Sequence, residues 1–214
     1  GTPALLIFQY NIIDIYLILL PISIFTSCTN ILIFFYKNKS LKIQFEKQFH
    51  KEFFFICLPS VLFGLILLKE YQAIINFKIL VSLIIIFSIF FVNFVSKRYF
   101  KLNIFHLILI GTVHGLTNSG GTLLSLFFSK GSNKNKIRYY VTIFYLFLAS
   151  FQYVMTLVIF DLEKYFLINM AYIPVFLIFG VMLGNYAVKY INLDKFKILI
   201  NILAVITSGF LIFS

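Results

Sequence analysis

Residues 12–35 read IIDIYLILLPISIFTSCTNILIFF and carry a single charged residue, Asp14. An α-helix needs about 20 consecutive apolar residues to cross the hydrocarbon core of a bilayer. A second segment, residues 79–95, has no charged residue at all. A soluble fold of this length can bury one such segment but not several, so these segments predict an integral membrane protein.

The composition favours the same class over the whole chain. Apolar residues make up 61% of the 214 residues and charged residues 12%, with a mean hydropathy of +1.00. A soluble domain carries about 25% charged residues. The apolar segments are unbroken, whereas the strands of a membrane β-barrel alternate apolar and polar residues. We therefore expect an all-α, polytopic membrane helix bundle.

Breaks between the apolar segments predict six membrane-spanning helices and three shorter apolar pieces. The spans are expected at residues 15–36, 52–68, 74–95, 139–160, 165–188 and 196–213, and the shorter pieces at residues 3–8, 102–115 and 122–128. Cys28 and Cys57 both fall in apolar spans and lack the spacing of a metal site or a disulfide framework. No metal and no cofactor is expected.

The chain has a formal net charge of +11, and its positive charge is concentrated in four loops. Their basic residues are Lys37, Lys39, Lys42, Lys47 and Lys51; Lys97, Arg98 and Lys101; Lys130, Lys134, Lys136 and Arg138; and Lys189, Lys195 and Lys197. Loops rich in Lys and Arg stay in the cytoplasm, so all four are expected on that side. Basic residues clustered in this way indicate orientation against anionic lipid and not binding to nucleic acid.

This orientation requires residues 102–128 to enter and leave the membrane on the same side. A helix over residues 102–115 would be about 21 Å long, which is too short to cross, and a polar stretch follows it at residues 117–121. We therefore predict a re-entrant hairpin of two half-helices, tolerated only where protein or a wet cavity surrounds the break. The alternative, one kinked helix that crosses, would place the loop at residues 130–138 outside.

The chain also repeats itself weakly. Gly1-Thr-Pro-Ala-Leu-Leu-Ile-Phe8 aligns with Gly121-Thr-Leu-Leu-Ser-Leu-Phe-Phe128, and the pair Pro59 and Gly64 aligns with the pair Pro174 and Gly180. Duplication of one hairpin plus three spans would give two inverted repeats, as in many transporters that bind substrate at broken helices. We expect a first repeat at residues 1–101, with the entering arm of its hairpin missing, and a second at residues 102–214.

The stretch at residues 111–122, Gly-Thr-Val-His-Gly-Leu-Thr-Asn-Ser-Gly-Gly-Thr, is the candidate binding site. Glycines permit close approach of a ligand to the backbone, and a half-helix that begins there directs N–H groups and its positive dipole end at an anion. The start of the chain would supply a second, opposed half-helix end. The candidate substrate-binding residues are Gly1, Thr2, Thr26, Asn30, Gly115, Thr117, Asn118, Ser119, Gly120, Gly121 and Thr122.

Each of these assignments has an alternative. Small residues also let helices pack closely, which is the interpretation we favour for Gly180 and Gly184. His114, deep in the predicted hairpin, either carries a proton coupled to transport, since imidazole changes charge near neutral pH, or stays neutral and only forms hydrogen bonds. The polar run at residues 26–30 either lines a cavity or bonds back to its own helix.

The motif His114-Gly-Leu-Thr-Asn-Ser-Gly-Gly121, together with the Gly-x-Pro opening at Gly1, resembles the sulfite exporter TauE/SafE family of membrane permeases. That family shows two repeats, each opening with a glycine-rich motif and an apolar half-helix, and a basic residue such as Arg138 commonly follows the second motif. The resemblance implies transport of small sulfur oxyanions or organic sulfonates across the bacterial inner membrane. The motif positions are Gly1, Gly115, Asn118, Gly120 and Gly121.

The expected function is therefore a secondary transporter of small anions in a multi-pass inner-membrane protein. An anion channel would use the same broken helices, and a non-transporting assembly subunit is a further alternative. An intramembrane enzyme is not expected, because all 7 acidic residues lie in loops or at span ends. The expected partners are a small anionic substrate and the lipid bilayer, with a homo-oligomer left open.

Overall fold

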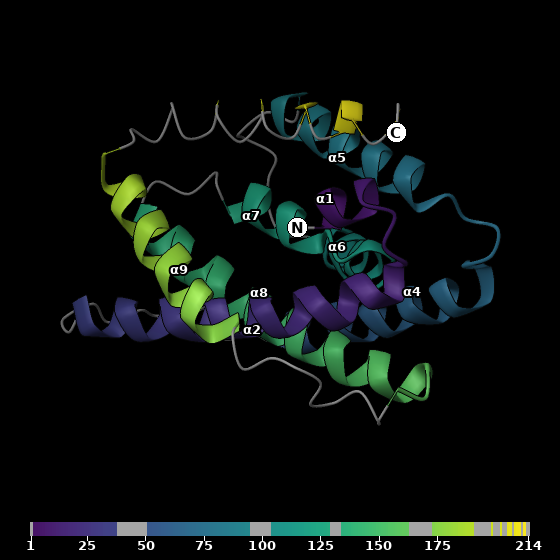
Figure 1. The fold of residues 1–214 in the computed structure, drawn as a ribbon, viewed down its shortest axis with the longest axis horizontal. Helices are drawn as coiled ribbons and strands as arrows, with labels where there is room; N and C mark the ends of the chain where they lie inside the picture. The colour runs from purple at the N-terminus through teal and green to yellow at the C-terminus, as the bar shows by residue number, and fades with distance from the viewer. Residues whose placement is uncertain are drawn as a thin grey trace.

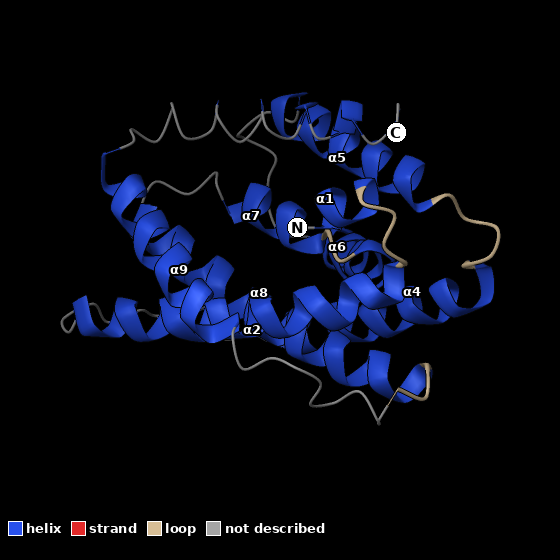
Figure 2. Cartoon of the chain, viewed as in Figure 1, coloured by secondary structure: helices blue, strands red, loops and turns tan. Residues whose placement is uncertain are grey.

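The computed structural model describes residues 2–37, 51–94, 104–128, 134–162 and 173–190, together with 198, 202, 205, 206, 208–210 and 212. Every regular element of the described residues is helical (Figure 2). In chain order these are α1 (Thr2–Ile7), α2 (Ile12–Lys37), the π-helix η1 (Phe53–Cys57), α4 (Leu58–Tyr71), α5 (Phe77–Phe94), α6 (Ile104–Thr117), α7 (Gly120–Phe128), α8 (Lys134–Ile159) and α9 (Ile173–Tyr190). The expected all-α class is confirmed.

Three helices of the described residues are long and apolar enough to cross a membrane, judged by length and composition: Ile12–Tyr36, Phe53–Tyr71 and Arg138–Ile159. They coincide with three of the six predicted spans. α5 and α9 overlap two more, and the last predicted span, at residues 196–213, lies mostly outside the described residues. Large apolar side chains face outward, with Leu32 70% and Phe55 78% exposed. Such a surface suits lipid and indicates a membrane protein.

α2 and α8 pack against each other and run in opposite directions (Figure 1). Toward the end of α2, the ring centroid of Phe34 lies 4.5 Å from that of Tyr139 at the start of α8. Nearer the middle of both helices, the hydroxyl oxygens of Ser23 and Tyr145 are 3.3 Å apart. The end of the bundle that carries Lys37 is therefore also the end at which α8 begins.

α4 packs against α8 in the same direction. The ring of Phe53, just before α4, lies 4.6 Å from that of Phe144. At the opposite end the Lys69 ammonium donates a 2.8 Å hydrogen bond to the Ile159 carbonyl oxygen, in the last turn of α8. The ends of α4 and α8 therefore lie together, at the end of the bundle opposite to the one at which both helices begin.

A π-turn precedes Pro59 in the described part of the chain. Pro59 has no N–H to donate, and its ring clashes with the carbonyl group four residues earlier in a regular α-helix. The wider turn of η1, in which the Leu58 N–H bonds to the Phe53 carbonyl oxygen, relieves this clash. The helix therefore continues from η1 into α4 without a break.

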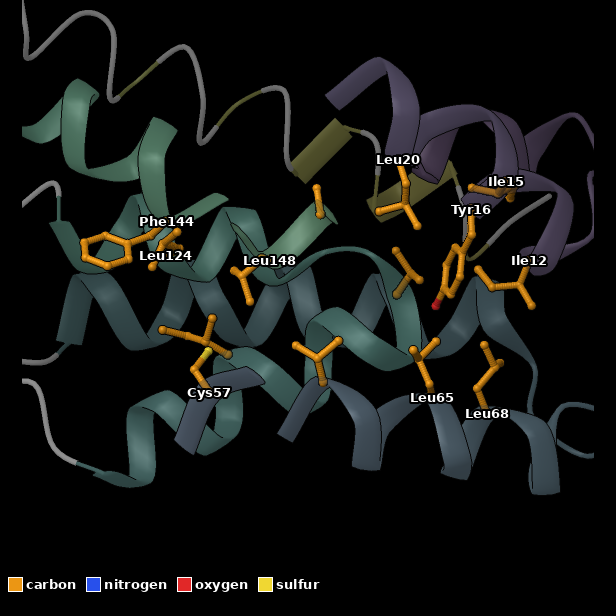
Figure 3. Close-up of a cluster of buried hydrophobic side chains, with 14 of the residues drawn as sticks. Ile12, Ile15, Tyr16, Leu20, Cys57, Leu65, Leu68, Leu124, Phe144 and Leu148 are labelled. Atoms are coloured by element: carbon orange, nitrogen blue, oxygen red, sulfur yellow. The ribbon is translucent and has the colours of Figure 1, made fainter. Parts of the chain in front are cut away.

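α6 lies alongside α4 and runs in the same direction, because Gly111 faces Cys57 while Gly115 faces Gly64 further along both helices. The hydrophobic core fills the space among these two helices, α2 and α8 (Figure 3). Tyr16 of α2 enters this core beside leucines of α4. It is fully buried, so its hydroxyl needs a partner inside the bundle.

α7 turns back from α6 along α8. Gly121 in its first turn lies against the ring of Tyr145, and Phe128 at its end stacks on Tyr140, one turn nearer the start of α8, with 5.8 Å between ring centroids. α6 therefore begins, and α7 ends, toward the end of the bundle at which α8 begins. Residues 104–128 do not form one continuous helix.

Candidate polar site at the helix break

The break between α6 and α7 is built by four consecutive residues. α6 ends at Thr117, and Asn118 has a φ of 54°, the left-handed conformation that Asn adopts more readily than most residues. Its N–H donates a 2.8 Å hydrogen bond to the His114 carbonyl oxygen, which caps α6. The Ser119 N–H donates to the Thr117 hydroxyl oxygen at 3.3 Å. α7 then begins at Gly120.

Gly120 is needed because the two half-helices meet closely. A Cβ at this position would lie 2.5 Å from the Cβ of His114 and 2.6 Å from the Ile110 carbonyl oxygen. Gly121 has no room either, since a Cβ there would run into the Tyr145 ring. Both glycines therefore permit the turn itself and place the start of α7 against α6 and α8.

The side chains at the break are buried. His114 and Thr117 are fully buried, and Asn118 and Ser119 are each 8% exposed. Within the described residues, both ring nitrogens of His114, Oδ1 of Asn118 and Oε1 of Gln152 have no hydrogen-bond partner. A buried polar atom without a partner costs about 1–3 kcal/mol. A polar solute that reached this point would find donors and acceptors ready to bind it.

Two helices, α2 and α8, donate hydrogen bonds to the last carbonyl groups of α6. Gln152 of α8 donates from Nε2 to the His114 carbonyl oxygen at 2.9 Å. Tyr16 of α2 donates to the Gly115 carbonyl oxygen at 3.0 Å. The Tyr145 ring lies edge-on to His114, 5.6 Å between centroids. α2 and α8 therefore hold the break in place.

The glycines before the break have a different role. A Cβ on Gly115 would meet the backbone of α4 at Val61, Gly64 and Leu65, and a Cβ on Gly111 would meet the Cys57 carbonyl group. These positions let α4 and α6 approach to backbone contact. The packing alternative therefore accounts for Gly111 and Gly115, and the polar site begins at His114.

The remaining candidate residues differ in position and burial. Gly121 is half-buried and Thr122 exposed; Thr2 is buried in α1, which packs on α2 and α5; Gly1 lies outside the described residues. Thr26 and Asn30 are half-buried on α2, one and two turns beyond Ser23. Gly180 and Gly184, expected to pack a helix, have no described heavy atom within 4 Å of an added Cβ.

Sequence reasoning missed Gln152, Tyr16 and Tyr145. Gln152 could have been found, because an amide in the middle of a predicted span needs a partner in the interior of a bundle. The two tyrosines carry no such signal, since a Tyr in an apolar segment is ordinary in a membrane helix. Their position at the break follows only from how α2 and α8 pack on α6.

No protein-family model, curated protein or solved structure matches the chain. The chemistry of the break therefore follows from the groups that form it. These are hydroxyl, amide and imidazole groups, and among the described residues no three His, Cys, Asp or Glu side chains gather as metal ligands would. Such a set suits a small polar solute held by hydrogen bonds.

Proposed function

We propose that this protein is a secondary transporter of small anions across the bacterial inner membrane. The observation that carries the proposal is the set of unpartnered buried polar atoms of His114, Asn118 and Gln152 at a broken helix. In a bundle of apolar helices, irregular backbone is tolerated where protein buries it or where it lines a water-filled cavity, and the unpartnered polar groups at this break favour a place for a polar solute. A solute at this point would satisfy those groups.

The sign of the solute charge follows from the elements at the break. The first N–H groups of α7, at Gly120 and Gly121, have no partner within their own helix, and the helix dipole is positive there. The Ser119 hydroxyl already donates to the Thr117 carbonyl oxygen at 3.2 Å, so the free donors are these backbone groups. No Asp, Glu, Lys or Arg side chain among the described residues is buried. Neutral donors at a helix start favour an oxyanion.

The substrate class rests on the resemblance of residues 114–121 to the glycine-rich motif of sulfite exporters. We propose sulfite and small organic sulfonates, whose three oxygens on one sulfur can take several N–H and O–H donors at once. In this proposal, the other helices form the scaffold around the site and present an apolar surface to lipid.

We further propose that α6 and α7 form a re-entrant hairpin within two inverted repeats. If α1, α2 and α4 correspond to α7, α8 and α9, the contact of α1 with α2 has its counterpart in α7 with α8. The contact of α4 with α8 likewise corresponds to that of α9 with α2. The antiparallel course of α2 and α8 supports the same duplication, because inverted repeats reverse equivalent helices.

Flux into proteoliposomes tests the function. The purified chain is reconstituted and offered sulfite, thiosulfate, sulfoacetate and taurine, and we expect saturable uptake of at least one of the anions. Gly121→Leu should abolish it, because the side chain would collide with Tyr145 and displace the start of α7. Gly184→Leu is the matched control: the same change, made where no atom of the described residues lies within 4 Å of an added Cβ, leaves uptake unchanged.

Gln152→Leu separates binding from folding, because it removes the amide at similar volume. We expect uptake to fall about tenfold while the protein stays monodisperse in detergent. Uptake that never saturates would identify a channel instead of a carrier. Absence of uptake for every anion, or full uptake by Gly121→Leu, would remove the proposed site.

A further inference from the structure

We infer that the anion binds together with one proton, which His114 takes up as the anion enters the break. This inference rests on the proposed transport function and names its coupling ion. The observations behind it are the burial of His114, the unpartnered nitrogens of its ring, and the unpartnered carbonyl oxygens of Asn118 and Gln152, two residues that both bond to the His114 backbone carbonyl group.

An anion at the break needs a compensating positive charge. An ion in an apolar interior is strongly disfavoured unless an opposite charge lies close by. None of the described Lys and Arg side chains is buried, so they provide no permanent positive charge for an anion in the interior. His114 is the buried side chain at the break that can become positive by binding a proton.

The neighbours of His114 on other helices also bear on the charge of the site. Tyr145 on α8 and Tyr16 on α2 contact α6 through their side chains, and Cys57 at the end of η1 lies against Gly111 through its backbone; all three side chains are uncharged when protonated. α7 contributes no titratable side chain. The charged side chains that the structure describes on α2, α4, α5 and α8 lie toward the helix ends: Asp14, Lys69, Glu70 and Arg138 are exposed and Lys78 is partly exposed.

Lys78 is the basic residue of α5, which also contacts α6. It lines a separate groove of about 430 Å³ with Leu6 and Ile212. It is therefore not placed to neutralise an anion at the break. His114 remains the group through which charge at this site can be balanced.

A protonated His114 ring also needs hydrogen-bond acceptors. A protonated imidazole has two N–H donors and no acceptor. Asn118, one helical turn after His114, and Gln152, which bonds to the His114 backbone, each leave a carbonyl oxygen free. These oxygens are not bonded to the ring in the empty site; in the proposed bound state one of them accepts from one ring N–H, and an oxygen of the anion accepts from the other. The neutral ring in the empty site has one N–H fewer to satisfy.

Linkage gives the direction of the pH effect. The anion-bound state holds one more proton than the free state, so lower pH favours binding. Where His114 of the free protein is neutral, the affinity for the anion rises about tenfold for each unit by which the pH falls. The proton leaves with the anion on the other side of the membrane.

Calorimetry on the full chain in detergent counts the protons directly. Methanesulfonate and thiosulfate are the probes, because their charges are constant in the neutral pH range, whereas sulfite itself takes up a proton there. Each is titrated in two buffers of different ionisation enthalpy, and the difference in heat gives the number of protons taken up. We expect one proton per anion for the wild-type protein.

Variants assign that proton. His114→Gln should bind the anion more weakly and take up none, whereas His106→Gln, on the same helix, should still take up one. The double variant His50→Gln/His106→Gln keeps His114 as the last histidine and should also take up one, which decides the assignment even if His114→Gln does not fold.

The outcomes separate the two proposals. Anion binding without proton uptake, or one proton taken up by a folded His114→Gln protein, overturns the coupling and leaves transport standing. A protein that neither binds nor transports any anion of the panel overturns the proposed function and the coupling with it.

Discussion

Asn118 combines a backbone role and a side-chain role that mutation can separate. Its φ of 54° ends α6, and its Oδ1 is one of the free acceptors at the break. Glycine adopts this backbone conformation without strain, whereas alanine does not. Asn118→Gly and Asn118→Ala therefore remove the same side-chain amide, but only Asn118→Ala also strains the backbone.

We expect Asn118→Gly to keep the stability of the wild-type protein and Asn118→Ala to be about 1 kcal/mol less stable than Asn118→Gly. Denaturant unfolding in detergent, followed by circular dichroism, measures this difference. Both variants should transport the anion poorly, because both lack Oδ1. Wild-type flux in Asn118→Gly would show that the residue shapes the chain and contacts no substrate.

At the scale of elements, the contact of α4 with α6 depends on glycine. A Cβ on Gly115 would meet backbone atoms of α4, which cannot move aside as a flexible side chain can. Gly184 on α9 offers a comparison, since it is exposed and a Cβ there meets no heavy atom of the described part of the chain within 4 Å. The same substitution thus probes a packed and an open helix position.

Gly115→Ala should lower the free energy of unfolding by about 1–3 kcal/mol through overpacking. Gly184→Ala should change it by less than about 0.5 kcal/mol. Unfolding by a denaturing detergent in mixed micelles provides the measurement for both. Equal destabilisation at the two positions would contradict the close approach of α4 and α6.

At the scale of the whole molecule, the ends of the bundle differ in charge. Lys51 and Arg138 lie at the end where α4 and α8 begin, and the hydrogen bond of Lys69 to the Ile159 carbonyl group joins the other end. An excess of Lys and Arg keeps loops in the cytoplasm. The turns after α4 and α8 should therefore face the outside of the cell.

Cysteine labelling tests this orientation. In a protein without native cysteines, we expect Glu70→Cys and Asp161→Cys, both exposed positions, to react with a membrane-impermeant maleimide in intact cells. Lys51→Cys, also exposed, should react only after permeabilisation. If Asp161→Cys were protected like Lys51→Cys, residues 104–128 would cross the membrane once instead of turning back.

The sequence alone determined the helical class, the positions of three long spans and the break near Asn118. These depend on local properties: the length of apolar runs, the clustering of Lys and Arg, the tendency of Asn to adopt a positive φ, and the fit of Gly where two helices approach closely. Each can be read within about 20 residues of chain, the length of one span.

The tertiary structure alone decided which residues surround the break and which glycines pack. Tyr16 reaches the Gly115 carbonyl oxygen across 99 positions of sequence, and Gln152 reaches His114 across 38. Such contacts depend on the rotation and axial offset of one helix against another. Every face of an apolar span is apolar in a membrane protein, so its sequence carries little periodic signal to show which face turns inward. The packing of α2, α4, α6 and α8 makes that choice.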